Sequence, residues 1–211
     1  MKNTISLLAL VLFSLTGHSQ TKPIFFYNEN GEELSKEIFI ASLKNGQNID
    51  LYFENDTIQY GVAVQREKFG RLNNTAFSEL KKYLSELSGA EIDSSKNIVI
   101  NYITALPNKE QTIQSRTGWN VLHNDYLRKL HKIADINQFW INSPECDNLD
   151  YYHENRINWL EDKENLFKKI FFPFEIVNGN YILIRPNGIY YYYLGEHGKH
   201  IIWENSKRFF K

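Results

Sequence analysis

The stretch that decides the fold is KNIVINYITALPNKEQ, residues 96–111, which begins as a strand and ends as a polar loop. The segment Asn97–Ile103 is mostly apolar and rich in β-branched residues. Such a run is typical of a central strand that is covered on both faces. The loop that follows carries Ala105, Leu106 and Pro107 but no cysteine. Its composition bears on function, because a loop between a strand and a helix is a common place for redox chemistry.

The segment before this strand predicts a helix. In NNTAFSELKKYLSELSG the apolar residues recur at helical spacing, among them Phe77 and Leu80. Asn74 or Thr75 is expected to cap the start of the helix, and Gly89 suits its end.

The segments after the loop predict two more helices and a strand. GWNVLHNDYLRKLHKIAD is helical through Leu122, Tyr126 and Leu130, and INQFWIN is a short strand. NRINWLEDKENLFKKIFF is predicted as a helix through Leu160 and Phe167. These elements alternate with strands, which implies parallel pairing through crossovers.

Two hairpins complete the prediction. The first covers residues 49–67 around the polar turn ENDT. The second is NYILIRPNGIYYYYLG, in which Pro186 presets the turn while Asn187 and Gly188 tolerate the backbone angles of a tight reversal. A short aromatic tail, WENSKRFFK, follows.

The element order from Ile58 onward resembles that of the thioredoxin-like fold. NIVINYI is similar to the central strand of that family, and YILIRPNGIYYYYLG to its terminal hairpin. The resemblance implies an α/β fold: a thioredoxin-like mixed sheet flanked by helices, with an N-terminal β extension. An alternative is an α+β domain with a structural role, in which the order is coincidental.

The family's redox cysteines would lie near Ala105, where a helix N-terminus lowers a thiol pKa. The family's cis-proline would precede the penultimate strand, where this chain has VNGNY and no proline. Cys146 is the only cysteine, so an intramolecular disulfide is excluded, and it follows a different strand. The sequence therefore predicts a redox-inactive scaffold.

The first 19 residues are predicted to be a secretory signal peptide, because a short apolar run is followed by small residues. Residues 20–57 are expected to form the N-terminal extension, and residues 58–211 the thioredoxin-like domain. Export to the periplasm or the extracellular medium follows, and no later segment is apolar enough to span a membrane. The net charge of −1 gives no reason to expect nucleic acid as a partner.

An acidic segment offers candidate metal ligands in Cys146, Asp150 and His153, although their spacing matches no short-range zinc pattern and favours a solvated loop. His197 and His200 are three residues apart, but the neighbouring glycines favour a loop. Neither a GxSxG motif nor a phosphate-binding glycine loop occurs. No catalytic residue and no cofactor is therefore assigned.

The tyrosine run suggests a possible interaction surface. Tyr190 and Tyr192 share one face of their strand, and with Trp203 they form an exposed aromatic surface unless the tail covers it. The expected function is an exported, non-catalytic binding module for an unidentified protein or small molecule. The alternative is a metal-dependent envelope enzyme that uses the segment around Cys146 and His153.

Overall fold

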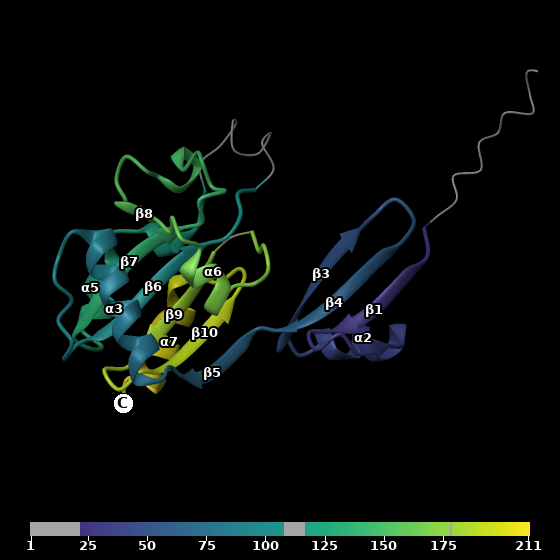
Figure 1. Cartoon of the computed structure of the whole chain (residues 1–211), viewed down its shortest axis with the longest axis horizontal. Helices are drawn as coiled ribbons and strands as arrows, with labels where there is room; N and C mark the ends of the chain where they lie inside the picture. The colour runs from purple at the N-terminus through teal and green to yellow at the C-terminus, as the bar shows by residue number, and fades with distance from the viewer. Residues whose placement is uncertain (1–21, 108–116, 178) are drawn as a thin grey trace, which may run out of the picture.

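The computed structural model describes residues 22–107, 117–177 and 179–211, so the predicted signal peptide lies outside the described residues. The described chain forms a four-stranded and a six-stranded sheet. Figure 1 shows the smaller sheet, in purple and blue, beside the larger domain.

The small sheet has the strand order β2-β1-β4-β3, in which β1 and β4 are parallel. Its elements are β1 (Ile24–Asn28), β2 (Glu33–Leu34), α2 (Lys36–Leu43), β3 (Asn48–Glu54) and β4 (Gln59–Gln65). The helix α2 begins where the Ser35 hydroxyl accepts a hydrogen bond from the Ile38 amide. It packs on one face of the sheet, where the rings of Phe26 and Phe39 lie 4.6 Å apart.

The hairpin predicted for residues 49–67 is present as β3 and β4, whose turn is closed by amides donating to the Asn55 side chain. Because β4 pairs within the small sheet, the change from one sheet to the other falls at Arg66 and not at Ile58. The boundary expected between residues 57 and 58 therefore falls inside the small sheet, because it separates the paired strands β3 and β4.

The large sheet has the order β5-β10-β9-β6-β7-β8. Its strands are β5 (Glu67–Arg71), β6 (Asn97–Ile103), β7 (Ile136–Asn142), β8 (Trp159–Glu161), β9 (Asn180–Ile184) and β10 (Ile189–Leu194). Strand β6 runs parallel to β7 and antiparallel to β9, which is antiparallel to β10. Strands β6, β7, β9 and β10 form the mixed, thioredoxin-like part of this sheet that the sequence predicts. The strand predicted to begin at Ile58 pairs instead in the small sheet as β4, and the edges of the large sheet are β5 and β8.

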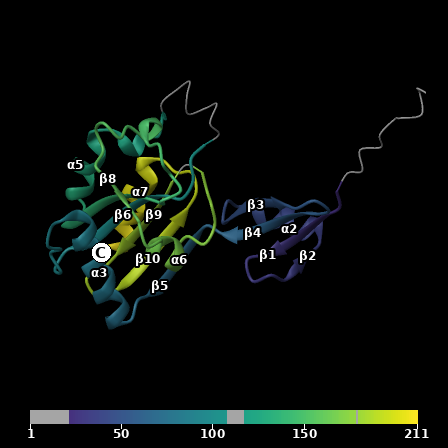
Figure 2. The same cartoon turned by 45° about the horizontal axis from the view of Figure 1, so that its top comes forward.

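Helices cover both faces of the large sheet (Figure 2). They are α3 (Asn74–Ser88), α5 (Asp125–His131), α6 (Leu166–Ile170) and α7 (Lys199–Phe209), with 3-10 turns η1 (Asn120–Leu122) and η2 (Asp150–Tyr152). Ile98 and Ile100 of β6 belong to the core beneath α3 and α6, whereas Val99 and Ile103 belong to the core beneath α5 and α7. The central strand is thus buried on both faces, as its composition predicts.

The predicted helix α3 is confirmed, but its cap lies one residue earlier than expected. The Asn73 side chain accepts a hydrogen bond from the Ala76 amide at 2.8 Å, so neither Asn74 nor Thr75 is the N-cap. Gly89 ends the helix with a positive φ of 67°, a conformation that glycine adopts without steric cost.

The long helix predicted for NRINWLEDKENLFKKIFF is wrong in its first half. Trp159 and Leu160 pair with β7 as the edge strand β8. The buried carboxylate of Asp162 then accepts the amides of Leu166 and Phe167, and α6 begins there. The carboxylate thus supplies acceptors for the free amides of a helix N-terminus, so the helix begins at Leu166 and not before Leu160.

The aromatic tail is not an irregular segment, because it forms most of the closing helix α7. The final hairpin is confirmed, and Gly188 has the positive φ of 78° that its turn requires. Within the described residues, no helix is both long and apolar enough to cross a lipid bilayer.

Candidate functional site

Several strand ends meet at one edge of the large sheet, which we call the carboxyl edge. Strands β6 and β10 end there with Ile103 and Leu194, and β9 begins there with Asn180. Because β7 is parallel to β6, it ends at the same edge with Asn142. Active sites of open α/β sheets lie beyond the carboxyl ends of the strands, so this edge is the first place to search for function.

A buried polar network closes the centre of the carboxyl edge. The Thr104 hydroxyl donates to the Ile176 carbonyl at 2.8 Å and accepts from the Ile176 amide at 2.9 Å. The side chain of Asn180 donates to the same hydroxyl at 3.4 Å and accepts from the Gly195 amide at 2.9 Å. These bonds tie β6, β9 and β10 together at the point where the sequence resemblance places redox cysteines.

Cys146 lies at the same edge, which the sequence analysis did not foresee. It follows β7, but the parallel pairing of β7 with β6 brings its sulfur to 4.0 Å from the Ile103 carbonyl oxygen. The side chain is 4% exposed, and burial, with a smaller effect of Glu145, raises the pKa of the thiol to about 12. The thiolate form, which is the nucleophile and metal ligand, is thereby disfavoured.

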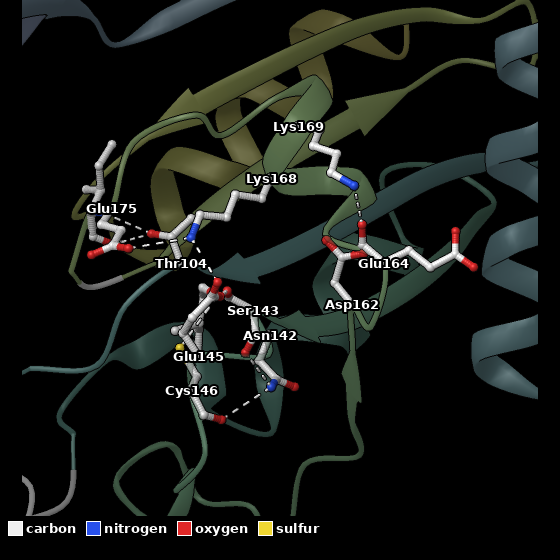
Figure 3. A network of polar contacts seen from close by, with 12 residues as sticks. Thr104, Asn142, Ser143, Glu145, Cys146, Asp162, Glu164, Lys168, Lys169 and Glu175 are labelled. Carbon is white, nitrogen blue, oxygen red and sulfur yellow. Dashed lines mark hydrogen bonds and ion pairs between the residues drawn. The ribbon is translucent and has the colours of Figure 1, made fainter.

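Lys168 forms two ion pairs beside Cys146 (Figure 3). The Lys168 ammonium on α6 lies 3.3 Å from the Glu145 carboxylate and 3.5 Å from that of Glu175. Both carboxylates are exposed, so this arrangement contributes little free energy. It places one cation between two anions beside the sulfur.

The candidate metal ligands Cys146, Asp150 and His153 do not form a metal site. Among the described residues, no group of three or more histidine, cysteine or acidic side chains could hold an ion. Cys146 is buried, whereas Asp150 is exposed on η2. The Nε2 atom of His153 lies 3.4 Å from the Thr117 carbonyl. The acidic segment is therefore a set of local turns.

The two C-terminal histidines also differ in environment. His197 is buried in the loop before α7, whereas His200 is exposed and belongs to the helix. The expectation of one polar loop holding both is therefore wrong for His200. The Nδ1 atom of His197 lies 2.8 Å from the Gly195 carbonyl, and three aromatic rings surround the imidazole.

The proposed aromatic surface of Tyr190, Tyr192 and Trp203 is not formed. Tyr192 and Trp203 are buried, and Tyr190 is half-buried with its ring edge-to-face to Phe171 at 5.1 Å. Tyr192 packs in the core beneath α6, whereas Trp203 packs in the core beneath α5 and α7. Residues on opposite faces of a sheet cannot line one surface.

Exposed aromatic rings occur on the small sheet and also on β5, where Phe69 is 69% exposed. Phe25 and Phe53 are 38% and 37% exposed, and Phe53 stacks on Tyr60 with ring centroids 5.3 Å apart. The strand register places Phe25, Phe53 and Tyr60 on the face opposite α2. The adjacent aromatic pairs Phe25-Phe26 and Tyr52-Phe53 indicate that each strand carries one ring on each face. They do not indicate which face the helix covers.

Neither a family model nor a curated protein matches this chain. A solved structure with some similarity is that of a secreted disulfide oxidoreductase of Mycobacterium tuberculosis, homologous to DsbE of E. coli. The two chains are 14% identical with a TM-score of 0.34, and the alignment covers 58% of this chain and 91% of that one. The assignment of a thioredoxin-like fold rests here on the order and directions of the strands.

Proposed function

We propose that this protein is an exported, non-catalytic binding module on a thioredoxin-like scaffold that has no thiol exchange activity. The observation that carries the proposal is the state of its single thiol. Thiol–disulfide exchange needs an accessible thiolate, whereas Cys146 is buried with its pKa raised to about 12. Exchange within one molecule also needs a second cysteine, and Cys146 is the only cysteine in the sequence.

The polar network at the carboxyl edge supports the same proposal. Thr104 uses its hydroxyl as donor and acceptor toward Ile176, and the adjacent Ala105 forms a bridge with Val177. Hydrogen bonds of buried groups hold this segment in one arrangement. A scaffold of this kind presents a fixed surface for binding and lacks the two thiols that a redox cycle uses.

Native Cys146 is expected to react with a soluble aromatic disulfide reagent at least about 100-fold more slowly than the unfolded chain, because burial withholds the thiolate. Stopped-flow absorbance with and without urea measures both rates. A Cys146→Ser, Ala105→Cys variant is the control, since its half-buried thiol at the carboxyl edge should react at a rate close to that of the unfolded chain.

The redox half of the proposal fails if the purified protein catalyses glutathione-dependent reduction of insulin. It also fails if native Cys146 reacts within about tenfold of the unfolded chain, since a thiol that accessible retains the reactivity of a free cysteine.

The binding half is tested by crosslinking in cells that export the tagged protein. A photo-reactive residue at Phe53, which is exposed on the small sheet, is compared with one at Glu86, which is exposed on α3. We expect one dominant adduct from Phe53, unchanged by Cys146→Ser, and a different or weaker pattern from Glu86. The same adducts from both positions, or none from either, would contradict a specific binding role.

A further inference from the structure

His197 has a ring nitrogen that the described chain leaves without a partner. The residue is 5% exposed and follows β10 at the carboxyl edge. Its Nδ1 atom lies 2.8 Å from the Gly195 carbonyl oxygen. Because a carbonyl only accepts, Nδ1 carries the proton, and Nε2 is left as a hydrogen-bond acceptor.

The Nε2 atom is buried, and no donor among the described residues reaches it. A buried polar atom without a partner is costly, so native proteins have few of them. The ring contacts of His197 are with Trp119, Tyr181 and Tyr193, at centroid distances of 5.3, 4.8 and 5.7 Å. Aromatic faces do not replace a strong donor, so this acceptor is free for another molecule.

A pocket of about 410 Å³ adjoins this histidine. Its wall includes His197, the half-buried rings of Trp119 and Tyr151, and the side chains of Thr117 and Asn120. The volume lies in the range of small-molecule sites and exceeds that of a cavity that holds benzene. The pocket has room for a ligand of one or two rings.

Trp119 is held firmly at this pocket. Its indole N–H donates to the His197 carbonyl at 2.8 Å. Its ring lies against the backbone of Gly179, where an added Cβ would come within 2.6 Å of the indole. A rigid aromatic wall reduces the entropy that binding costs, so Trp119 and His197 form a preorganised pair.

The charges around the pocket are balanced. Glu196 is the charged residue in its wall, and it is exposed. The Arg66 guanidinium donates to the Glu196 carbonyl at 3.4 Å and to the Tyr193 hydroxyl at 3.2 Å. One anion with one nearby cation does not select a strongly charged ligand.

We propose that this pocket binds a small uncharged ring compound that donates an O–H or N–H hydrogen bond to Nε2 of His197. Trp119 and Tyr151 pack on the ring of the ligand, and a small displacement of the half-buried Tyr151 side chain opens the path to Nε2 while Trp119 stays in place. The inference goes beyond the proposed function and does not depend on a macromolecular partner.

Matched probe molecules test the proposal. Phenol and indole carry a donor, whereas fluorobenzene and indene have similar shapes without one. NMR spectra of the purified protein with ¹⁵N-labelled histidine report on Nε2 directly. We expect phenol and indole to shift the Nε2 resonance of His197 and to bind about fivefold more tightly than their partners, which is the effect of one hydrogen bond that contributes about 1 kcal/mol.

The variant His197→Phe keeps an aromatic ring and removes the acceptor, so it should bind phenol and fluorobenzene alike. If this variant does not fold, the spectra of the native protein still decide the question. Equal affinities for the members of each pair, or no shift of the His197 resonance at millimolar phenol, would overturn the proposal. A thiol assay is unaffected by either outcome, so failure here is distinct from failure of the proposed function.

Discussion

Replacing Asp162 with alanine is expected to lower the free energy of unfolding by about 4 kcal/mol. The carboxylate is fully buried and accepts four hydrogen bonds. Tyr83 and Tyr102 donate their hydroxyls at 2.8 and 2.9 Å, and the amides of Leu166 and Phe167 donate at 2.9 and 3.0 Å. Removing the carboxylate leaves four donors, three of them buried and that of Leu166 half-buried, without this acceptor, which is one of the few causes of so large a loss.

Urea denaturation monitored by fluorescence measures this loss. Asp93→Ala is the matched control, because Asp93 is an exposed aspartate whose bonds to Ser95 are local. The variants Tyr83→Phe and Tyr102→Phe should each cost about 1–2 kcal/mol, since each removes one donor and leaves the carboxylate bonded. A loss below about 1 kcal/mol for Asp162→Ala would show that α6 and β8 do not depend on this carboxylate.

Asp162 also explains where sequence reasoning failed. The apolar spacing of Leu160 and Phe167 fits a helix, and periodicity alone cannot detect a buried carboxylate between them. The tertiary contacts with Tyr83 and Tyr102 come from α3 and β6, which are distant in sequence. Local pattern was sufficient for α3 and for the hairpin at Gly188, because their caps and turns are made by neighbouring residues.

The candidate site was harder to predict for a similar reason. The absence of cysteine after β6 is visible in the sequence, and it supports the functional proposal beside the burial of Cys146. Cys146 approaches Ile103 because β6 and β7 are parallel and end at the same edge of the sheet. The element order predicts this parallel pairing, but the prediction for Cys146 considered only that it follows a different strand. The environment of His197 depends on Trp119, which lies 78 residues earlier, so no local motif indicates it.

The burial of His197 predicts a specific dependence of stability on pH. Burial lowers the pKa of the imidazole from its usual 6.5 to about 4, the bond with Gly195 opposes this effect, and the Arg66 cation adds to it. The rings of Tyr181 and Tyr193 pack against the imidazole as well. The folded protein therefore holds this histidine neutral under conditions in which the unfolded chain protonates it.

The sign follows from proton binding. Above pH 6.5 both states hold a neutral imidazole, so the residue makes no pH-dependent contribution. Between pH 6.5 and about 4 the unfolded chain binds the proton more readily, and the free energy of unfolding falls with pH. Below about pH 4 both states are protonated and the loss is complete. The pKa difference corresponds to a total loss of about 3 kcal/mol.

Urea denaturation at pH 7 and pH 4 tests this expectation in the native protein and in His197→Phe. Between these two pH values the native protein should lose about 3 kcal/mol more than the variant, because carboxylates that titrate in the same interval are common to both and cancel in the difference. His131→Phe is the matched control, because it makes the same substitution at an exposed histidine on α5. A difference below about 1 kcal/mol between native protein and His197→Phe would mean that the charged imidazole finds solvent or a hydrogen-bond acceptor. In that case Nε2 is accessible to water, and the pocket at the carboxyl edge does not need a ligand to satisfy it.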